Sequence, residues 1–386
     1  MAKTVPFLFV LLLLSLSAIC QYQVGVTELF FYDSSRERDI ETHIFYPQEE
    51  GQPNDEVAEG QFPVVSIGHG FGMGTGSYTY LWEHLVPQGY IAALPATESG
   101  IFSVSHHDFG LDLAFVIQEL KSRGSDQESM FYGHIDSTSA IMGHSMGGGA
   151  AVLGAQNSDS ITTLVTLAAA ETSPSMIEAA GSLTLPGLTF AGTEDCVTPP
   201  PENQEPLFNN LSDCKAYITI TGGSHCQFAN SDTFCELGEV GCNTGSFIAE
   251  EEQHEIITTI ITPWLEAWLK NSYEGWVNFT ELSGGGSNYS VDMQCSENPP
   301  FPLTAVAPEK PSSALTIYPN PAEKMLNLKG DASRIKRFVV YDSKGKAVMN
   351  DRLSSNTIDI SFLPQGVYFI KLHGKHLFLS FSFAKK

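Results

Sequence analysis

The sequence is poor in basic residues over most of its length. Residues 21–300 hold 6 Lys and Arg against 38 Asp and Glu, whereas residues 301–386 hold 13 basic and 6 acidic residues. An acidic surface of this kind repels nucleic acid and anionic surfaces, so neither is expected as a partner of the first region. We interpret the acidity as a solvated surface rather than a cation-binding site. The opposite charges of the two regions predict two modules.

Long apolar runs are absent except at the N-terminus, in residues 5–19. This run has the length of a secretory signal peptide and is too short to be read first as a membrane span. Small side chains at Ala18 and Cys20 predict cleavage before Gln21, so residues 1–20 are the predicted signal peptide. A lipoprotein acylated at Cys20 is the alternative, and the bulky Ile19 disfavours it. The mature protein is expected to be exported, without a transmembrane span.

The sequence also lacks any Cys-x-x-Cys pair. The cysteines that remain after Cys20 are Cys196, Cys214, Cys226, Cys235, Cys242 and Cys295. Zinc sites need ligands paired at short spacing, so no metal site is expected here. An even number of cysteines in an exported chain predicts disulfides instead, with the connectivity open.

Proline and small polar residues gather in residues 297–313, which is typical of an extended linker. The sequence therefore predicts a larger module over residues 21–296 and a smaller one over residues 314–386. In the larger module apolar strands alternate with helices, and a helix over residues 254–270 closes it. This alternation predicts an α/β fold with a mostly parallel sheet covered on both faces. An antiparallel strand pair is expected at its edge, in the first residues after the signal peptide.

The sharpest motif is GHSMGG, residues 143–148, which matches Gly-x-Ser-x-Gly. An apolar strand precedes it and a helix of small residues follows, so the chain must turn abruptly at Ser145. Such a turn forces the central residue into a strained backbone conformation and exposes its hydroxyl. This context predicts Ser145 as a nucleophile.

A serine hydroxyl needs a base and an orienting acid, because it is a poor nucleophile unaided. In this setting the two should follow in the order acid, then histidine, each after a later strand. His225 follows the strand that begins at residue 215 and is the predicted base. Asp195 is the predicted acid, while Glu194 and Glu171 stay open as alternatives.

The other histidines are weaker candidates. His144, beside the nucleophile, is predicted to bind substrate rather than to act as a base. His106 and His107, in a predicted loop, could line the cleft. His69 belongs to a glycine-rich motif, and His254 is expected to be solvated at the start of the closing helix.

Acyl chemistry also needs donors for the developing oxyanion. The backbone N–H of Met146 is one predicted donor, and the loop GHGFGMG (68–74) should supply the second from Phe71. The ring of Phe71 is expected to form a wall of the substrate cleft. The loop lacks the lysine and the spacing of a phosphate-binding loop, so we exclude that function.

Two cysteines directly follow the predicted acid and base. A Cys196–Cys226 bridge would tie the acid loop to the base loop, and we state it as a hypothesis. Other pairings, such as Cys196–Cys214, compete with it.

Together the motifs HGF, GHSMGG, GTED and GGSHCQF resemble the α/β-hydrolase superfamily over about residues 24–280. More narrowly, they are similar to its secreted branch near the dienelactone hydrolases, chlorophyllases and cutinase-like polyester hydrolases. The resemblance implies a serine ester hydrolase without a cofactor. Polyester hydrolases carry an aromatic clamp, which Phe71 matches on one side. Residues 170–174 (AETSP) replace the tryptophan expected on the other, which favours simple esters over aromatic polyesters.

Three alternatives to a simple esterase stay open: a polyester hydrolase, a peptidase or acyltransferase on the same site, and a non-catalytic binding protein. In the smaller module, the segments LTIYPNPAEKMLNLKG, FVVYDSKGKAV and IDISFLPQGVYFIKL and the final AKK resemble the type A sorting domain of the type IX secretion system. The resemblance implies a small β-sandwich that addresses the chain to the secretion machinery. Because this module has no tryptophan, a polymer-binding role is disfavoured.

Overall fold

The computed structural model describes residues 22–51, 53, 56–211, 214–242, 247–295, 316–329, 332, 335–341, 347–353, 355–374 and 377–386. The chain divides into two compact units between residues 301 and 302. The predicted signal peptide (1–20) and linker (297–313) lie outside the described residues. Within the described ranges, no helix has both the length and the apolar character that crossing a bilayer requires.

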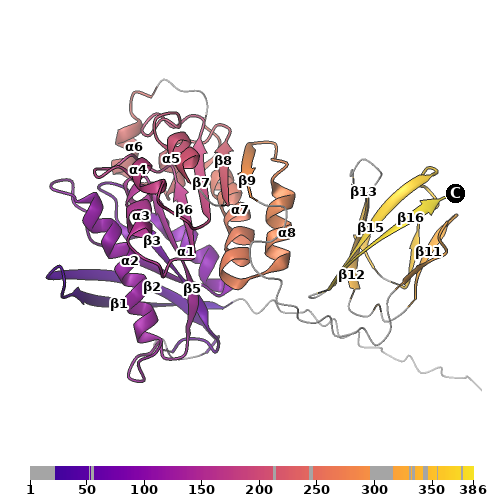
Figure 1. Cartoon of the computed structure of the whole chain (residues 1–386), viewed down its shortest axis with the longest axis horizontal. Helices are drawn as coiled ribbons and strands as arrows, with labels where there is room; N and C mark the ends of the chain where they lie inside the picture. Colours follow the sequence, from indigo (N-terminus) through magenta and orange to yellow (C-terminus); the bar gives the residue numbers. More distant parts are fainter. Residues whose placement is uncertain are drawn as a thin grey trace, which may run out of the picture. The chain divides into compact units, whose positions relative to one another are not determined.

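A nine-stranded sheet forms the centre of the first unit (Figure 1). Its strands are β1 (Gln23–Asp33), β2 (Arg38–Gln48), β3 (Phe62–Gly68), β4 (Ile91–Pro95), β5 (Ile135–His144), β6 (Thr163–Leu167), β7 (Gly187–Gly192), β8 (Lys215–Ile220) and β9 (Tyr289–Gln294). The order across the sheet is β1-β2-β4-β3-β5-β6-β7-β8-β9, and neighbours from β4 to β8 are parallel. The expected antiparallel pair, β1 with β2, is confirmed at one edge. At the other edge, β9 pairs antiparallel with β8 and was not predicted.

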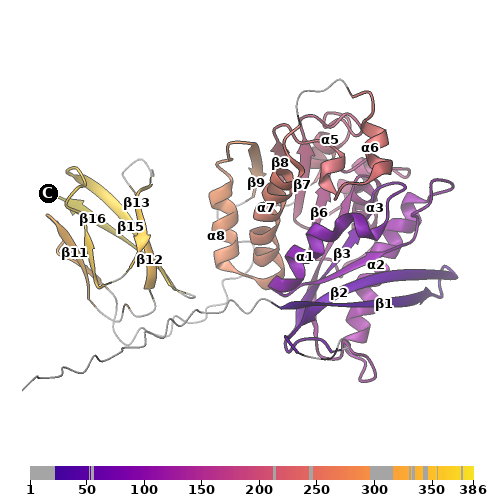
Figure 2. The same cartoon turned by 180° about the vertical axis from the view of Figure 1, so that it is seen from behind.

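Helices cover both faces of this sheet, as the alternation of elements predicted. They are α1 (Thr79–Leu85), α2 (His106–Arg123), α3 (Met146–Gln156), α4 (Met176–Ala180), α5 (Gln204–Asn210), α6 (Thr233–Glu239), α7 (Glu250–Lys270) and α8 (Tyr273–Leu282), with short 3-10 turns η1 (Thr75–Tyr78), η2 (Val86–Gln88) and η3 (Cys226–Phe228). Figure 1 shows α2 and α3 in front of the sheet, and Figure 2 shows α1, α7 and α8 on the opposite face. This confirms the α/β fold class.

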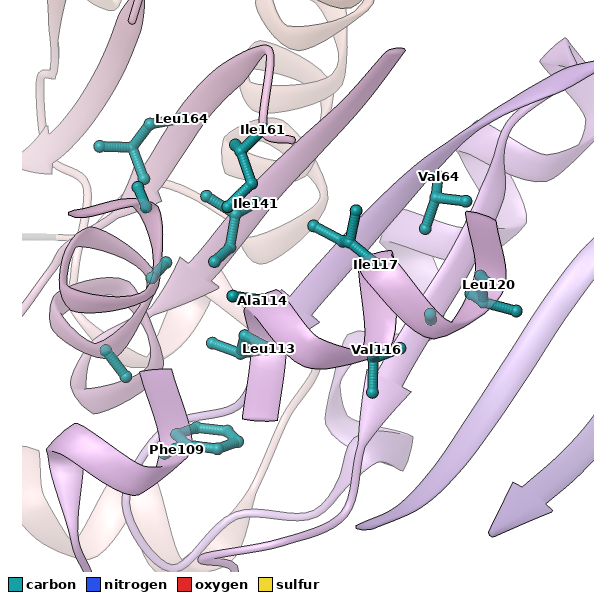
Figure 3. Close-up of a cluster of buried hydrophobic side chains, with 14 of the residues drawn as sticks. Val64, Phe109, Leu113, Ala114, Val116, Ile117, Leu120, Ile141, Ile161 and Leu164 are labelled. Carbon is teal, nitrogen blue, oxygen red and sulfur yellow. The ribbon is translucent and has the colours of Figure 1, made fainter. Parts of the chain in front are cut away.

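The two faces hold separate apolar cores because successive strand residues point to opposite sides. Val64 of β3 packs into the core beneath α2 and α3, while the next residue, Val65, packs into the core beneath α1 and α7. In the first core, Leu113 and Ile117 of α2 face the sheet beside Ile141 of β5 (Figure 3). Apolar side chains fill both cores. The polar residues of the candidate site therefore lie at the ends of the parallel strands.

A buried charge cluster ties the β1–β2 hairpin to α2. Asp112 is fully buried and accepts hydrogen bonds from the guanidinium of Arg38 at both carboxylate oxygens, and the Arg36 Nη1 lies 2.7 Å from its Oδ1. Burial acts to raise the pKa of Asp33, but hydrogen bonds from Ser35 and Arg36 outweigh it and hold that pKa at about 2. Not all of the acidic residues therefore belong to the solvated surface inferred from the composition.

The second unit is all-β. One sheet has the order β10-β11-β14 and the other β13-β12-β15-β16, and every pairing is antiparallel. The strands are β10 (Thr316–Tyr318), β11 (Met325–Lys329), β12 (Ile335–Tyr341), β13 (Ala347–Arg352), β14 (Thr357–Asp359), β15 (Gly366–Gly374) and β16 (Leu377–Lys385). Leu326 and Ile358 of the first sheet share one core with Val340 and Ile370 of the second. This is the small all-β module that the sequence predicted.

Candidate active site

A strained turn separates β5 from α3 at Ser145. Its backbone angles are φ 53° and ψ −120°, a region that side-chain-bearing residues rarely occupy. The turn is held by the Ser145 N–H, which donates to the Leu167 carbonyl at 3.0 Å, and by the Ser145 carbonyl, which accepts from Gly149 and Ala170. The predicted conformation of the Gly-x-Ser-x-Gly turn is thus present, and Ser145 stands directly before the N-terminus of α3.

Glycines on both sides of Ser145 allow close backbone packing. A Cβ at Gly143 would lie 2.1 Å from the Gly147 carbonyl oxygen, and a Cβ at Gly147 would lie 2.3 Å from the backbone carbonyl of Gly68. No side chain larger than hydrogen fits at either position without a backbone shift. The close approach places Gly147 against Gly68 and His69, at the start of the glycine-rich loop that follows β3.

His225 joins Ser145 to Asp195 through its two ring nitrogens. Nε2 lies 3.0 Å from the Ser145 Oγ, and Nδ1 lies 2.8 Å from the Asp195 Oδ2. The three residues follow β5, β7 and β8, and the carboxyl ends of parallel strands meet at one edge of a sheet. All three side chains are buried or nearly so. The structure therefore brings together the three residues predicted as nucleophile, acid and base.

The Asp195 carboxylate is held by its own loop. Oδ1 accepts the N–H groups of Val197 at 3.0 Å and Thr198 at 2.7 Å. Among the alternative acids, Glu171 is exposed and accepts a hydrogen bond from the Ile177 N–H. Glu194 contacts the neighbouring Thr193 through its carboxylate at 3.4 Å. Of these three carboxylates, that of Asp195 is the one bonded to His225.

Thr198 belongs to this arrangement, although the sequence analysis did not single it out. Its hydroxyl lies 2.8 Å from the Asp195 Oδ2 and 3.1 Å from the His225 Nδ1, and it accepts from the buried Gln204 amide. The sequence feature that could have identified Thr198 is its position three residues after Asp195. Aspartate side chains in turns commonly accept N–H groups of the next few residues, which brings those residues close to the carboxylate.

The backbone N–H groups of Met146 and Phe71 are the two predicted oxyanion donors. In the described part of the chain, neither the Met146 N–H nor the Phe71 N–H donates to another residue. The loop before Phe71 is held by the Gly70 N–H, which donates to the Tyr78 hydroxyl at 2.7 Å. Phe71 is 41% exposed.

The prediction that His144 binds substrate is wrong. Its side chain is fully buried behind His225, with the two ring centroids 4.8 Å apart, so it cannot line a cleft. Burial and the neighbouring His225 hold the pKa of His144 well below its ordinary value, so the ring is neutral. Its Nε2–H donates to the His225 carbonyl at 3.1 Å, and its Nδ1 accepts from the Tyr78 hydroxyl at 3.0 Å.

Other histidines also lie in positions that differ from the prediction. His106 and His107 are not in a loop but in the first turn of α2, because Ser105 caps that helix by accepting the Asp108 N–H. His107 is exposed, and the Nδ1 of His106 accepts the Ser173 N–H.

His254 is only partly exposed, because its ring stacks on Tyr80 with centroids 3.7 Å apart. His69 is buried, and its two ring nitrogens lie 2.9 and 2.8 Å from the carbonyls of Gly70 and Thr97. Neither histidine contacts Ser145.

All six cysteines form disulfides, as predicted for an exported chain. The pairs are Cys196–Cys242, Cys214–Cys295 and Cys226–Cys235. The hypothesised Cys196–Cys226 bridge is wrong, and so is its competitor Cys196–Cys214. The reason is that the segment after the base loop supplies a partner to each loop: Cys235, in α6, bonds to Cys226, and Cys242, three residues after the end of α6, bonds to Cys196.

One group of potential metal ligands lies on the β1–β2 hairpin. Glu28, Glu41 and His43 place ligand atoms within 4.8 Å of one another, and both glutamates are exposed. These strands form the edge of the sheet farther from β7 and β8, so the group has no part in the arrangement around Ser145.

The described geometry agrees with comparisons to known proteins. Residues 42–258, more than half of the chain, match the family described as PET hydrolase-like. Residues 316–380 match the secretion system C-terminal sorting domain, which indicates that the chain is secreted.

A bis(hydroxyethyl) terephthalate hydrolase of Streptomyces coelicolor is 26% identical over 193 residues, which are 49% of this chain and 56% of the relative. The chain thus spans about half the length of this curated relative. Because the family match covers more than half of the chain, the chain belongs to the PET hydrolase-like family.

Proposed function

We propose that the protein is a secreted serine carboxylic-ester hydrolase in which Ser145, His225 and Asp195 form a catalytic triad. The observation that carries the proposal is the continuous path of hydrogen bonds from the Asp195 carboxylate through the His225 ring to the Ser145 Oγ. Membership of the PET hydrolase-like family supports the same chemistry. The strained backbone at Ser145 supports it further, because strain of this kind concentrates at active sites.

Each residue has a defined task in the proposed reaction. The His225 Nε2 takes the proton from Ser145 as its Oγ attacks the ester carbonyl, and Asp195 stabilises the resulting imidazolium. The N–H groups of Met146 and Phe71 stabilise the oxyanion, each contributing about 3–4 kcal/mol in the transition state. His225 then gives the proton to the departing alcohol. Water attacks the acyl-enzyme in the same way and releases the carboxylic acid and free Ser145.

The substrate class follows less directly. The curated relative is named for hydrolysis of bis(hydroxyethyl) terephthalate, an aromatic diester, which makes aromatic esters the second candidate beside simple ones. Residues 170–174 contain no aromatic side chain, so any aromatic contact opposite Phe71 has to come from another element. The sorting domain is proposed to be the part that the secretion machinery recognises.

The test is hydrolysis of p-nitrophenyl esters across acyl lengths by the full chain, together with labelling by a fluorophosphonate probe. We expect saturable hydrolysis and a single covalent label that peptide mapping places on Ser145. A chain that neither hydrolyses the esters nor takes the label is a binding protein on a hydrolase fold. Faster turnover of amides, or acyl transfer to added alcohols in preference to water, would favour the peptidase or acyltransferase alternative.

Tyr78→Phe is expected to lower kcat for p-nitrophenyl acetate by about tenfold with little change in KM. The substitution removes a hydroxyl that accepts the Gly70 N–H and donates to His144, so the loop carrying the Phe71 N–H loses its anchor. Tyr90→Phe is the matched control, because that buried hydroxyl bonds to no other described residue. Equal kcat values for the two variants would contradict the role assigned to Tyr78.

A further inference from the structure

Residues 168–171, which follow β6, form a strained segment bonded to the nucleophile turn. The Ala170 N–H donates to the Ser145 carbonyl at 2.9 Å. Ala168 has a φ of 44°, a left-handed conformation that residues other than glycine rarely adopt. Such a conformation persists only where neighbouring contacts hold it. Carbonyl groups of this segment are held by side chains of the acid loop and of α5.

Gln204, the first residue of α5, connects this segment to the acid loop. Its side chain is fully buried, and its Nε2 donates to the Ala169 carbonyl at 2.6 Å and to the Thr198 hydroxyl at 3.1 Å. The amide nitrogen has two protons, so one serves each contact. The Thr198 oxygen therefore accepts from Gln204, and its own proton must point to another group.

The proton of the Thr198 hydroxyl points to the acid. Its Oγ lies 2.8 Å from the Asp195 Oδ2 and 3.2 Å from the Ala168 carbonyl, and the charged carboxylate is the stronger acceptor. The same oxygen lies 3.1 Å from the His225 Nδ1, which is also 2.8 Å from the Asp195 Oδ2. Two acceptors at Nδ1 favour the tautomer that carries its proton there, which leaves Nε2 free to accept the Ser145 proton.

The loop between Thr198 and Gln204 is stiff. Residues 199–201 are three prolines, whose rings fix the backbone φ. Asn203, at the end of this loop, donates its Nδ2–H to the Pro199 carbonyl at 3.0 Å. Its Oδ1 accepts the Glu171 N–H at 2.9 Å, a second contact between the start of α5 and residues 168–171.

We propose that Thr198 and Gln204 are positioning residues of the triad. The Thr198 hydroxyl bonds to the Asp195 carboxylate. The Gln204 amide connects that hydroxyl to residues 168–171, which bond to the Ser145 carbonyl. This Thr198–Gln204 link joins the acid to the nucleophile without passing through the base. The inference rests on the proposed function, in which the base gains and loses a proton while the acid and the nucleophile keep their spacing.

The link should affect the chemical step rather than substrate binding. Thr198 and Gln204 are both buried, so neither side chain is open to a substrate. Without the Thr198 hydroxyl, the Asp195 Oδ2 loses one donor and the His225 ring loses one of its two acceptors. A displacement of about 1 Å at a catalytic group can cost about 100-fold in rate. We therefore expect a loss in kcat with KM almost unchanged.

The first test is Thr198→Val, which keeps the shape of the side chain and removes the hydroxyl. Hydrolysis of p-nitrophenyl acetate by the full chain is measured per site that reacts with a fluorophosphonate probe at completion, so that misfolded protein is not counted. We expect kcat about tenfold below wild type and KM within about twofold. Thr198→Ser keeps the hydroxyl and should restore kcat to within about threefold of wild type.

The matched control is Thr189→Val. Thr189 lies in β7, is fully buried, and its hydroxyl bonds to no other described group, so its removal should leave kcat within about twofold of wild type.

The second test uses Gln204→Met, which keeps the length of the side chain and removes the amide. We expect kcat to fall by about threefold, because the Thr198 hydroxyl and the Ala169 carbonyl lose their shared donor. In the double variant with Thr198→Val, kcat should match that of Thr198→Val alone, because the link is already broken there. Effects of residues in one hydrogen-bond network are non-additive in this way.

Equal kcat values in Thr198→Val and Thr189→Val would overturn the proposal, as would a loss that appears only in KM. A double variant whose loss is the product of the two single losses would contradict the link. If Thr198→Val does not fold, Gln204→Met decides: a lowered kcat supports the link and an unchanged kcat overturns it. Failure of the wild-type chain to hydrolyse the ester is a different result, which contradicts the proposed function itself.

Discussion

Replacement of Ser145 by alanine is expected to lower kcat for p-nitrophenyl acetate by about 10⁴-fold or more. The Ser145 Oγ is the hydroxyl that lies 3.0 Å from the His225 Nε2, and without it no acyl-enzyme can form. The residual rate should come from the oxyanion donors acting on attack by water. Steady-state kinetics on the purified full chain measures the effect, and mass spectrometry should show that the fluorophosphonate label is lost with it.

A matched control for this variant is Ser66→Ala. Ser66 lies in β3, is fully buried, and its hydroxyl bonds to no other described group, so its removal should leave kcat within about twofold of wild type. Activity in Ser145→Ala comparable to that of Ser66→Ala would refute the nucleophile assignment, provided both variants melt near the wild-type temperature.

Asp195→Asn should lower kcat by about 10⁴-fold while leaving the fold intact. The Asp195 Oδ1 already accepts the N–H groups of Val197 and Thr198, so the amide oxygen of asparagine would take that position. The amide NH₂ would then face the His225 Nδ1 and stabilise the tautomer that carries its proton on Nε2. A ring in that tautomer cannot accept the proton of Ser145, so general-base catalysis fails although the side chains occupy nearly the same space.

The two alternative acids provide the controls. Glu194→Gln and Glu171→Gln should keep kcat within about twofold, because neither carboxylate contacts His225 in the described structure. A loss in Glu171→Gln as large as that in Asp195→Asn would mean that the acid lies after β6 instead of β7. Measurement of all three variants under one set of conditions decides among the carboxylates that the sequence left open.

The residues of the candidate site could be predicted where a pattern of neighbouring residues in the sequence identified them. The turn at Ser145 was predicted from its glycines, because steric limits on the backbone act over a few residues. The ends of β7 and β8 could be placed from apolar runs, which put Asp195 and His225 at the edge where parallel strands end. The preference for Asp195 over Glu194 agrees with the structure, where adjacent side chains on the loop point in different directions.

The predictions for His144 and for the disulfide pairing failed because they depended on contacts distant in sequence. His144 was expected in the cleft, but Tyr78 and the His225 carbonyl hold its ring in the interior. The hypothesised disulfide failed because Cys235 in α6 and Cys242 after it are the partners of Cys226 and Cys196. The spacing of residues along the chain does not determine which distant side chains come into contact.

The amino-acid sequence by itself determined the α/β and all-β classes of the two modules, the strained turn at Ser145 and the order of its partners. Periodicity and glycine placement carry this information, since both act through neighbouring residues. The tertiary structure alone decided the disulfide pairs and the buried His144–Tyr78 network. These features depend on which segments pack together once the sheet is formed, because side-chain direction and Cβ distance are set by the whole fold.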